Sequence, residues 1–498
     1  MSRINTNVES LIARRAIGIN NESLNTALER LSTGLRINSG KDDPAGLIAS
    51  ETLRSSIRAI STAIDNANRA DTIVAVAEGG LQEVSSLLLE LENLIDQSAN
   101  EAGLTPQEIT ANQLQIDAIL QSIDRLAEAT AFGDKKLLNG TLAFTSSGIN
   151  VNQPTGATVS HLNKVQINAA KIPTGTFRNV VINVVKKSEI AYVSAVGAGT
   201  TGAGANPKNG TIAKATTLQV RGNFGSEVLS FASGTTMANI ATAINASKEL
   251  TGVSATASAA TGGPASIVFQ STSYGKDAFV SVSVLENVST AWVAQAAEKT
   301  DNGANGTVTV NGTNAIVNGL DANVRAGSLS LDLTLTPSFG GTTGGTSNFQ
   351  VLGGGAVFSI SPTVGLSGQE TIGINEVSAA KLGNAGVGFL STLGSGLGND
   401  LASKKFSTAQ RIVRAAINQI ASLRGRLGAF QKDTLVTTIN SLQVARENVT
   451  AAESAIRDSD FAVETSNLTR AQILVSASTS VLQLANAQPQ NALALLGG

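Results

Sequence analysis

The residues whose chemistry could support catalysis are few and isolated. Any Ser/His/Asp triad would have to use His161, the only histidine, and no serine lies in the G-x-S-x-G context of a nucleophile elbow. A zinc site of the H-E-x-x-H type needs two histidines, and the chain has no cysteine to supply thiolate ligands. We therefore interpret His161 as a surface residue and expect a protein that is not an enzyme and has no cofactor or metal.

Two other patterns match ligand-binding motifs only in part. Gly197, Gly199 and Gly202 spell G-x-G-x-x-G, but the following "AGANPKNGT" cannot start a helix and no carboxylate stands about 20 residues further on, as a dinucleotide site requires. We interpret these glycines as turn residues. The pairs Asp42-Asp43 and Asp458-x-Asp460 could hold a metal or act as acid and base. Both precede helical patterns, where carboxylates cap free N–H groups, so we interpret them as helix caps.

The acidic pairs stand between long amphipathic helices at both ends of the chain. Near the N-terminus the apolar spacing is 4, 3, 4, the spacing of a coiled-coil seam, and it recurs from Leu53 to Ile64 in a frame that has slipped by one residue. Near the C-terminus a last amphipathic stretch runs from 474 to 484. The predicted packing residues are Leu24, Leu28, Leu31, Leu35, Leu474, Ala477, Val481 and Leu484.

The frame slip predicts an elbow between the first two helices. Arg36 suits the last turn of the first helix and Gly40 its end, while Asp43 suits the N-cap and Pro44 the first position of the second. The residues assigned to the elbow, with their C-terminal counterparts, are Arg36, Lys41, Asp42, Asp43, Pro44, Arg457, Asp458 and Asp460.

Glycine separates the helical ends from the middle. Of 49 glycines, 36 lie in 141–400, and glycine favours turns over helices. In the middle, "SLSLDLTLT" (328–336) alternates like a half-buried strand, and Asn311-Gly312 suits a two-residue hairpin. One helix is expected at "TTMANIATAINA". The fold class is therefore α+β multidomain, with a β-rich insertion between helical ends.

Bulk properties narrow the partners. The net charge of −2 gives no reason to expect a nucleic acid. No run approaches the roughly 18 apolar residues of a membrane span. The opening "MSRINTNVES" has no apolar stretch of signal-peptide length, so we expect no cleaved signal.

The terminal segments carry a specific resemblance. "LERLSTGLRINSGKDDPAGL" (28–47) and "AESAIRDSDFAVETSNLTRAQILVSASTSVLQLANAQPQNALALL" (452–496) resemble the N- and C-terminal signatures of bacterial flagellins. "TAINASKELTGVSA" and "QSTSYGKDAFVSVSV" resemble the inserted motif of many flagellins and hook-associated proteins. The resemblance covers about 1–140 and 404–496, nearly all of both helical ends.

The resemblance implies an architecture. Residues 1–45 and 456–498 would form a paired coiled coil in the filament core. Residues 46–191 and 349–455 would form a helical rod with a β-hairpin, made from about 141–190 and 350–382. Residues 192–348 would form an outer β-rich domain.

The resemblance also implies a function: a structural subunit that polymerises with itself into the extracellular flagellar filament, for swimming motility. Its expected partners are the flagellar export apparatus, an export chaperone, the filament cap and hook-associated proteins. Two alternatives share these features, a hook–filament junction protein and a surface adhesin that acts through the insertion.

One segment bears on immune recognition. Many flagellins display arginines in a segment of the form "LQRVRELAVQSAN", which vertebrate cells sense through a toll-like receptor. The matching stretch here is "LLLELENLIDQSAN" (87–100), with Glu90 and Glu92 at the arginine positions and Leu94 retained. Because two charges are reversed, the resemblance implies weak receptor activation.

Overall fold

The computed structural model describes residues 6–100, 103–148, 150–152, 158–173, 176–196, 211–212, 215–258, 266–286, 298–384 and 387–496. The chain forms two compact units. Unit 1 comprises Met1–Asp71, Ser359–Gly368 and Lys432–Gly498, and unit 2 comprises Thr72–Phe358 and Gln369–Gln431.

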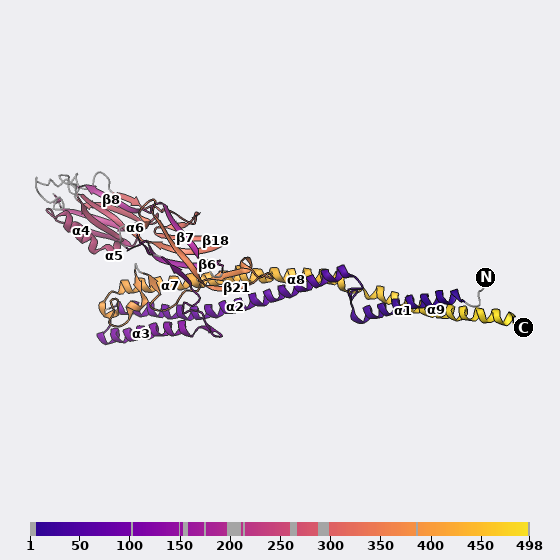
Figure 1. Cartoon of the computed structure of the whole chain (residues 1–498). Helices are drawn as coiled ribbons and strands as arrows, with labels where there is room; N and C mark the ends of the chain where they lie inside the picture. The colour runs from indigo at the N-terminus through magenta and orange to yellow at the C-terminus, as the bar shows by residue number, and fades with distance from the viewer. Residues whose placement is uncertain are drawn as a thin grey trace. The chain divides into compact units, whose positions relative to one another are not determined.

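Long helices build both ends of the chain, as expected (Figure 1). The helices are α1 (Val8–Thr33), α2 (Pro44–Ser98), α3 (Pro106–Ala129), α4 (Met237–Ala246), α5 (Lys248–Thr251), α6 (Pro337–Gly340), α7 (Phe406–Ala429), α8 (Thr437–Arg457) and α9 (Phe461–Leu496). Short 3-10 turns are η2 (Leu366–Gly368), η3 (Leu390–Leu393) and η4 (Leu401–Ser403), and a π-helical segment, η5 (Phe430–Val436), joins α7 to α8. Leu427 and Leu435 are both buried but stand one residue further apart than a heptad, and the wider π turn accommodates that extra residue.

Unit 1 contains a small core of its own. The first part of α2 packs on α8 through Ile60, Ala63, Ile64 and Leu442. Only four buried residues form this cluster, so this part of the molecule is held together by little apolar burial.

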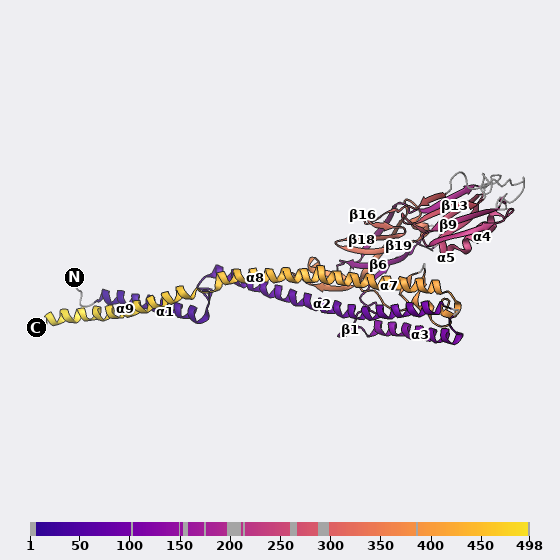
Figure 2. The same cartoon turned by 180° about the vertical axis from the view of Figure 1, so that it is seen from behind.

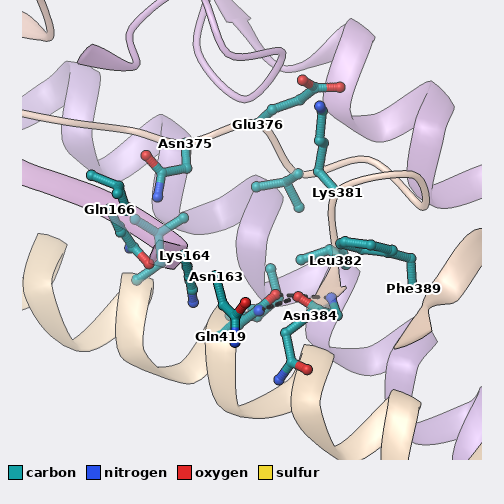
Figure 3. A pocket seen from close by; sticks show the side chains of 15 residues that line it. Asn163, Lys164, Gln166, Asn375, Glu376, Lys381, Leu382, Asn384, Phe389 and Gln419 are labelled. Atoms are coloured by element: carbon teal, nitrogen blue, oxygen red, sulfur yellow. Dashed lines mark hydrogen bonds between the residues drawn. The ribbon is translucent and has the colours of Figure 1, made fainter. Parts of the chain in front are cut away.

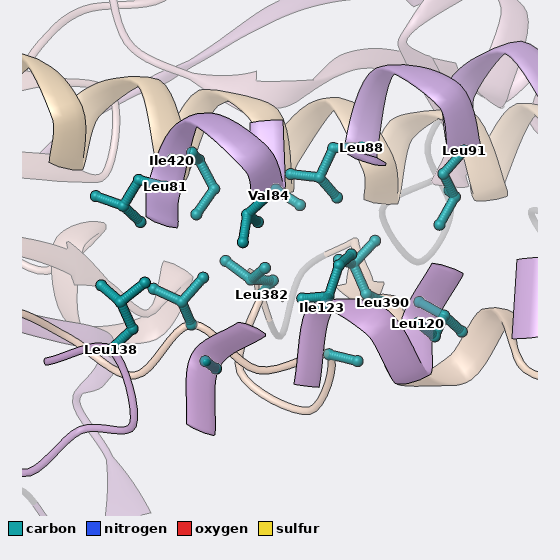
Figure 4. Close-up of a cluster of buried hydrophobic side chains, with 14 of the residues drawn as sticks. Leu81, Val84, Leu88, Leu91, Leu120, Ile123, Leu138, Leu382, Leu390 and Ile420 are labelled. Carbon is teal, nitrogen blue, oxygen red and sulfur yellow. The ribbon is translucent and has the colours of Figure 1, made fainter. Parts of the chain in front are cut away.

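Unit 2 contains the main helical core, where α2, α3 and α7 pack together (Figure 4). Leu81, Val84, Leu88 and Leu91 of α2 are fully buried. A capping box opens α3: Glu108 N–H donates to Thr105 Oγ1, and Thr105 N–H donates to Glu108 Oε2 at 2.7 Å. α7 begins at Phe406 without a side-chain cap, and Gln410 Nε2 donates to Asp96 Oδ1.

By length and composition, α2 could cross a membrane, and it is the one helix among the described residues to meet that criterion. One face of α2 between Leu81 and Ile95 lines the bundle core instead. A core helix of a bundle passes the same test, so this finding does not argue for a membrane.

The middle of the chain is rich in strands. They are β1 (Ala131–Phe132), β2 (Lys135–Lys136), β3 (Phe144–Ser147), β4 (Asn150–Asn152), β5 (Thr158–Ser160), β6 (Leu162–Ala170), β7 (Arg178–Lys186), β8 (Ile190–Val196), β9 (Thr216–Gly222), β10 (Gly225–Phe231), β11 (Val253–Ser258), β12 (Ser266–Tyr274), β13 (Phe279–Glu286), β14 (Glu298–Asn302), β15 (Thr307–Val310), β16 (Thr313–Asn314), β17 (Ile316–Asn318), β18 (Asp321–Ala326), β19 (Leu329–Leu335), β20 (Thr346–Gly354), β21 (Ala356–Ser359), β22 (Gln369–Ile372), β23 (Gly383–Asn384) and β24 (Gly388–Phe389).

Two sheets enclose one β core. Their strand orders are β16-β15-β7-β20-β3 and β17-β18-β19-β6. The predicted strand at 328–336 is β19, whose alternate residues from Leu329 to Leu335 are buried. Asn311 and Gly312 form the predicted hairpin turn between β15 and β16, both with positive φ.

His161 lies beside this core and is buried, so its interpretation as a surface residue was wrong. Its ring stacks on Phe339 at 4.6 Å between centroids, and its carbonyl accepts the N–H of Thr336 at 3.0 Å. The position precedes β6, and only the strand pairing places it against α6.

Strand pairing does not follow the expected domain boundaries at 191/192 and 348/349. β6 and β7 precede the first boundary, yet they pair with β19 and with β15 and β20. The expected hairpin from 141–190 and 350–382 is therefore replaced by strands of two larger sheets. Periodicity marks each strand but does not state its partner.

A second β region folds around its own core. Sheets β10-β9-β13-β14 and β11-β12-β8, with the predicted helix α4, enclose a cluster that includes Ile240, Phe269 and Val280. The chain enters and leaves this region at one point, where Glu189 and Ala304 form two backbone hydrogen bonds of 2.8 and 3.1 Å. Residues 190–303 therefore form a compact excursion from the first β core. The glycines 197–202 lie outside the described residues.

Candidate assembly surface

The terminal helices α1 and α9 lie side by side in both views (Figures 1 and 2). Asn20 Nδ2 donates to Ser478 Oγ at 2.7 Å, and Arg30 forms an ion pair of 3.1 Å with Glu464. Residue numbers rise along α1 as they fall along α9, so the pair is antiparallel.

Small side chains form the contact between these helices. The buried apolar residues of the pair are Ala13, Ala27, Ala471 and Ala485. Alanine lets two helices approach closely but removes little apolar surface from water. The seam is therefore close-fitting, with polar links at Asn20 and Arg30 and little hydrophobic stabilisation.

The predicted packing residues lie beside this seam and outside it. Leu474, Val481 and Leu484 are 45%, 56% and 64% exposed, and Ala477 is also exposed. On α1, Leu28 is 46% exposed, while Leu24 and Leu31 are half-buried. Leu474, Val481 and Leu484 thus remain largely uncovered in a single copy of the chain.

A shallow apolar groove follows this exposed side. It has a volume of about 440 Å³ and lies between the two helices. Its lining is Glu9, Ile12, Ala13, Ala16, Ala477, Ser478, Val481, Leu484, Ala485 and Gln488. Exposed apolar surface that extends over several turns is typical of a protein interface.

The first helix ends earlier than predicted. α1 stops at Thr33, and Gly34 takes the left-handed conformation (φ 74°) with its N–H bonded to the Arg30 carbonyl, so Gly40 does not end the helix. Leu35 and Arg36 therefore follow the helix, and Arg36 N–H donates to the Arg457 carbonyl at 2.6 Å. The elbow is held by backbone pairing between the two ends of the chain.

Carboxylates cap the helices on either side of the elbow, as predicted. Asp43 Oδ1 accepts the N–H of Gly46 at 2.9 Å, and α2 begins at Pro44. Asp460 Oδ1 accepts the N–H of Ala462 at 2.9 Å at the start of α9. These groups satisfy N–H donors that have no partner within the helix.

The other elbow residues bind within the turn. Asp42 Oδ2 accepts both the N–H and the hydroxyl of Ser39, at 2.8 and 3.0 Å, and these bonds lower the pKa of its carboxyl. Lys41 pairs with Glu22 at 2.9 Å on the surface, and this pair lowers the pKa of Glu22 and raises that of Lys41.

The C-terminal counterparts make similar contacts. Arg457 pairs with Glu51 at 3.0 Å, and Asp458 Oδ2 accepts the Ser454 hydroxyl at 2.5 Å. Across the described residues no group of three His, Cys, Asp or Glu side chains could hold a metal.

The segment assigned to immune recognition does not form one surface patch. Glu90 is exposed, whereas Glu92 pairs with Arg414 of α7 at 2.7 Å. Leu94 is 7% exposed and belongs to the bundle core. Leu94 therefore cannot be the apolar part of such a surface, because the helical period turns it inward.

The sequence of this chain matches the family models of flagellins at both ends and in the middle. Residues 4–143 match the bacterial flagellin N-terminal helical region, residues 411–496 the C-terminal helical region, and residues 217–273 the flagellin hook IN motif. It is 31% identical to a flagellin of Salmonella rubislaw over 534 aligned residues, covering 99% of both chains. The chain belongs to the flagellin family.

Other flagellins agree with this assignment. Flagellin D of Vibrio cholerae is 28% identical over 99% of both chains. Polar flagellin F of Vibrio parahaemolyticus is 40% identical over 156 residues, which are 31% of this chain and 41% of that relative. As a flagellin, the chain is a structural subunit of the extracellular filament of the bacterial flagellum, and it assembles with copies of itself.

The α1–α9 seam of this flagellin was missed in the sequence although a signal for it exists. Glu464, Ala471, Ser478 and Ala485 recur every seven residues and face α1. The prediction was based on large apolar residues, which lie on the neighbouring stripe from Leu474 to Leu484. An alanine-and-serine heptad would have indicated the seam.

Proposed function

We propose that the exposed stripe of α9 is the surface through which this filament subunit packs on other copies. Leu474, Ala477, Val481 and Leu484 form it, and the groove beside them supports the assignment. Exposed leucine and valine on a helix are covered when copies stack, which removes apolar surface from water.

A double variant tests this proposal. Val481→Ser with Leu484→Ser removes apolar surface that is exposed in the monomer, so the monomer should keep its circular dichroism spectrum and melting temperature. Polymerisation onto filament seeds should be lost, as measured by light scattering and electron microscopy. Leu250→Ser, at a 68% exposed residue of α5, is the matched control and should polymerise normally. Normal growth of the double variant would contradict the proposal.

The division into parts is also a proposal, with both boundaries of the outer part moved from those predicted. Residues 1–45 and 456–498 form the terminal part, and 46–189 and 304–455 form a rod with an attached β core. Residues 190–303 form the outer part. The closed β core around Phe269 and the Glu189–Ala304 bridge support these two boundaries.

Further partners follow from family membership. They are the flagellar export apparatus, an export chaperone, the filament cap and hook-associated proteins. A vertebrate toll-like receptor is a further proposed partner, and we expect this chain to activate it only weakly. Export is tested by expression in a flagellated host that lacks its own flagellin. The chain should then reach the medium or the filament only when the host's flagellar export apparatus is intact.

A further inference from the structure

A pocket of about 460 Å³ lies in unit 2 (Figure 3). β6 forms one wall, α7 another, and residues 375–384 with Phe389 the rest. The pocket is lined by Asn163, Lys164, Val165, Gln166, Asn375, Glu376, Val377, Lys381, Leu382, Gly383, Asn384, Phe389, Gln419, Ile420 and Leu423. Its volume lies in the range of small-molecule sites, roughly 300–1,000 Å³.

Hydrogen bonds between the walls hold the pocket open. Gly383 N–H donates to Gln419 Oε1 at 3.0 Å, and Gln419 Nε2 donates back to the Gly383 carbonyl at 2.5 Å. Val387 N–H donates to Asn384 Oδ1 at 2.9 Å. Because these groups satisfy one another, the loop is fixed on α7 before any ligand arrives.

Other polar groups on the walls are unused. Among the residues that the structure describes, no hydrogen-bond or ion-pair partner is recorded for the side chains of Asn163, Lys164, Gln166, Asn375 and Lys381. Asn163, Lys164 and Gln166 share β6, and Figure 3 shows Asn375 above them. Amide groups both donate and accept, so three of them suit a ligand with several hydroxyls.

Lys164 supplies a positive charge to the pocket, whose lining also carries the carboxylate of Glu376 and the ammonium of Lys381. The Lys164 side chain is half-buried, and burial lowers the pKa of its ammonium, with Arg426 adding to the effect while Asp332 and Asp321 oppose it. A partly desolvated ammonium without a hydrogen-bonded partner gains from a carboxylate more than a solvated one does. Leu382 and Phe389 give the pocket an apolar side.

We propose that this pocket binds a sugar acid of monosaccharide size, with its carboxylate on Lys164 and its hydroxyls on Asn163, Gln166 and Asn375. The apolar face of the sugar ring lies against Leu382 and Phe389. This site is independent of the α9 stripe and goes beyond the filament function. An acidic side chain of a neighbouring copy carries the same carboxylate, and the test separates the two sources.

The test is calorimetric titration of the full-length monomer with D-glucuronate, and with D-glucose and acetate as controls. We expect one site with a dissociation constant on the order of 1 mM, and binding at least about tenfold weaker for both controls. Lys164→Met should weaken glucuronate binding by at least about tenfold, the loss of one charge-assisted hydrogen bond. Lys135→Met, at an exposed lysine outside the pocket, should not change it.

Asn375→Ala provides a second variant, expected to weaken glucuronate more than acetate because acetate has no hydroxyls. The titration is repeated with assembled filaments. Equal affinity in monomer and filament supports the proposal. Absence of binding, equal binding of glucose, full affinity in Lys164→Met, or binding by the monomer that filaments lose would each overturn it, the last because a neighbouring copy then fills the pocket.

Discussion

The terminal helix pair and the helical bundle of unit 2 use the same secondary structure with different side chains. In the bundle, Leu81, Leu88 and Leu91 are fully buried among the other helices. In the terminal pair, the buried apolar residues are alanines, while Leu474 and Leu484 are exposed. The bundle buries a continuous leucine core within one copy of the chain, although Leu89 and Leu114 on its outside are exposed, whereas the terminal pair buries only alanines. A helix can thus be well formed in one chain and yet depend on other copies for its stabilisation.

Two deletions test which part of the β-rich middle folds as a separate region and can be removed without unfolding the rest of the chain. Removing 192–348 deletes β15, β19 and the first part of β20. β6 then loses β19, β7 loses β15 and half of its pairing with β20, and the core around Leu331 and Phe349 is destroyed. Removing 190–303 and joining Glu189 to Ala304 through two glycines keeps that core, because these residues are already bridged. We expect the shorter deletion to fold and polymerise and the longer one to aggregate.

Gel filtration, circular dichroism and seeded polymerisation measure this difference. If the longer deletion gave a folded protein that polymerises, the two sheets that contain β6 and β7 would not be required for folding or assembly. Aggregation of the shorter one would show that 190–303 is not a separate region.

Limited proteolysis compares the terminal pair with the bundle directly. We expect the terminal helices to open locally in the monomer, because little apolar burial holds them together. Trypsin should then cut at Arg14 and Arg470 at least about tenfold faster than at Arg125 of α3, although all three side chains are exposed. In filaments the fast cuts should disappear. Equal rates at the three sites in a proven monomer would contradict local opening.

Leucine truncations separate folding from assembly. Leu88→Ala leaves a cavity in a full core and should cost about 3 kcal/mol of unfolding free energy. Leu484→Ala, at a 64% exposed position, should leave the unfolding free energy of the monomer within about 0.5 kcal/mol while raising the critical concentration for polymerisation. Urea titration gives both free energies. A large loss of monomer stability in Leu484→Ala would show that the α9 stripe is buried within the monomer.

Most patterns within one helix or strand were predictable, although α1 is ended by Gly34 and not by the predicted Gly40, whereas the pairing of the strands was not. The cap by Asp43, the strand at Leu329–Leu335 and the turn at Asn311 each depend on local chemistry, and all are present. The pairing of β7 with β20 and the burial of His161 depend on tertiary structure, which periodicity does not encode.

The candidate surfaces divide in the same way. The helix α9 was predicted, but the side that faces α1 was not. The exposed stripe with Ala477 and Leu484 and the seam with Ser478 and Ala485 lie one residue apart, and both follow a heptad. The reading of Leu94 as a surface residue failed, since the retained "QSAN" fixes alignment but not the direction of a side chain.

The elbow should respond to loss of its cap and to acid. Asp43→Ala removes the acceptor of the Gly46 N–H and should cost about 1 kcal/mol in the part that includes the start of α2. Asp42 has a lowered pKa, so the stability that it contributes is present above its usual pKa and is lost as pH falls through the lower folded value. Asp42→Asn should therefore reduce the fall in melting temperature that the parent chain shows as pH is lowered. The same fall in melting temperature with decreasing pH in Asp42→Asn and in the parent chain would contradict the role of Asp42.

The smallest expected effect concerns the acidic stretch of α2 and the toll-like receptor. Glu90 is exposed and Glu92 pairs with Arg414, so the two positions are not equivalent. We expect weaker activation by this chain than by an arginine-bearing flagellin, and a partial gain from Glu90→Arg, which places a positive charge on the surface without breaking a contact. Glu92→Arg alone brings two guanidinium groups together, so its gain needs Arg414→Glu as well, which restores the pair with reversed charges.

Glu83→Arg is the matched control, because it makes the same change two helical turns earlier on the same helix. A reporter-cell titration with monomeric protein measures potency. Equal potency of the parent chain and an arginine-bearing flagellin would refute the weak activation. An equal gain from Glu83→Arg and Glu90→Arg would show a general effect of net charge. A gain confined to Glu90→Arg would place the receptor on the exposed side of α2, next to a core in which Leu94 has only a packing role.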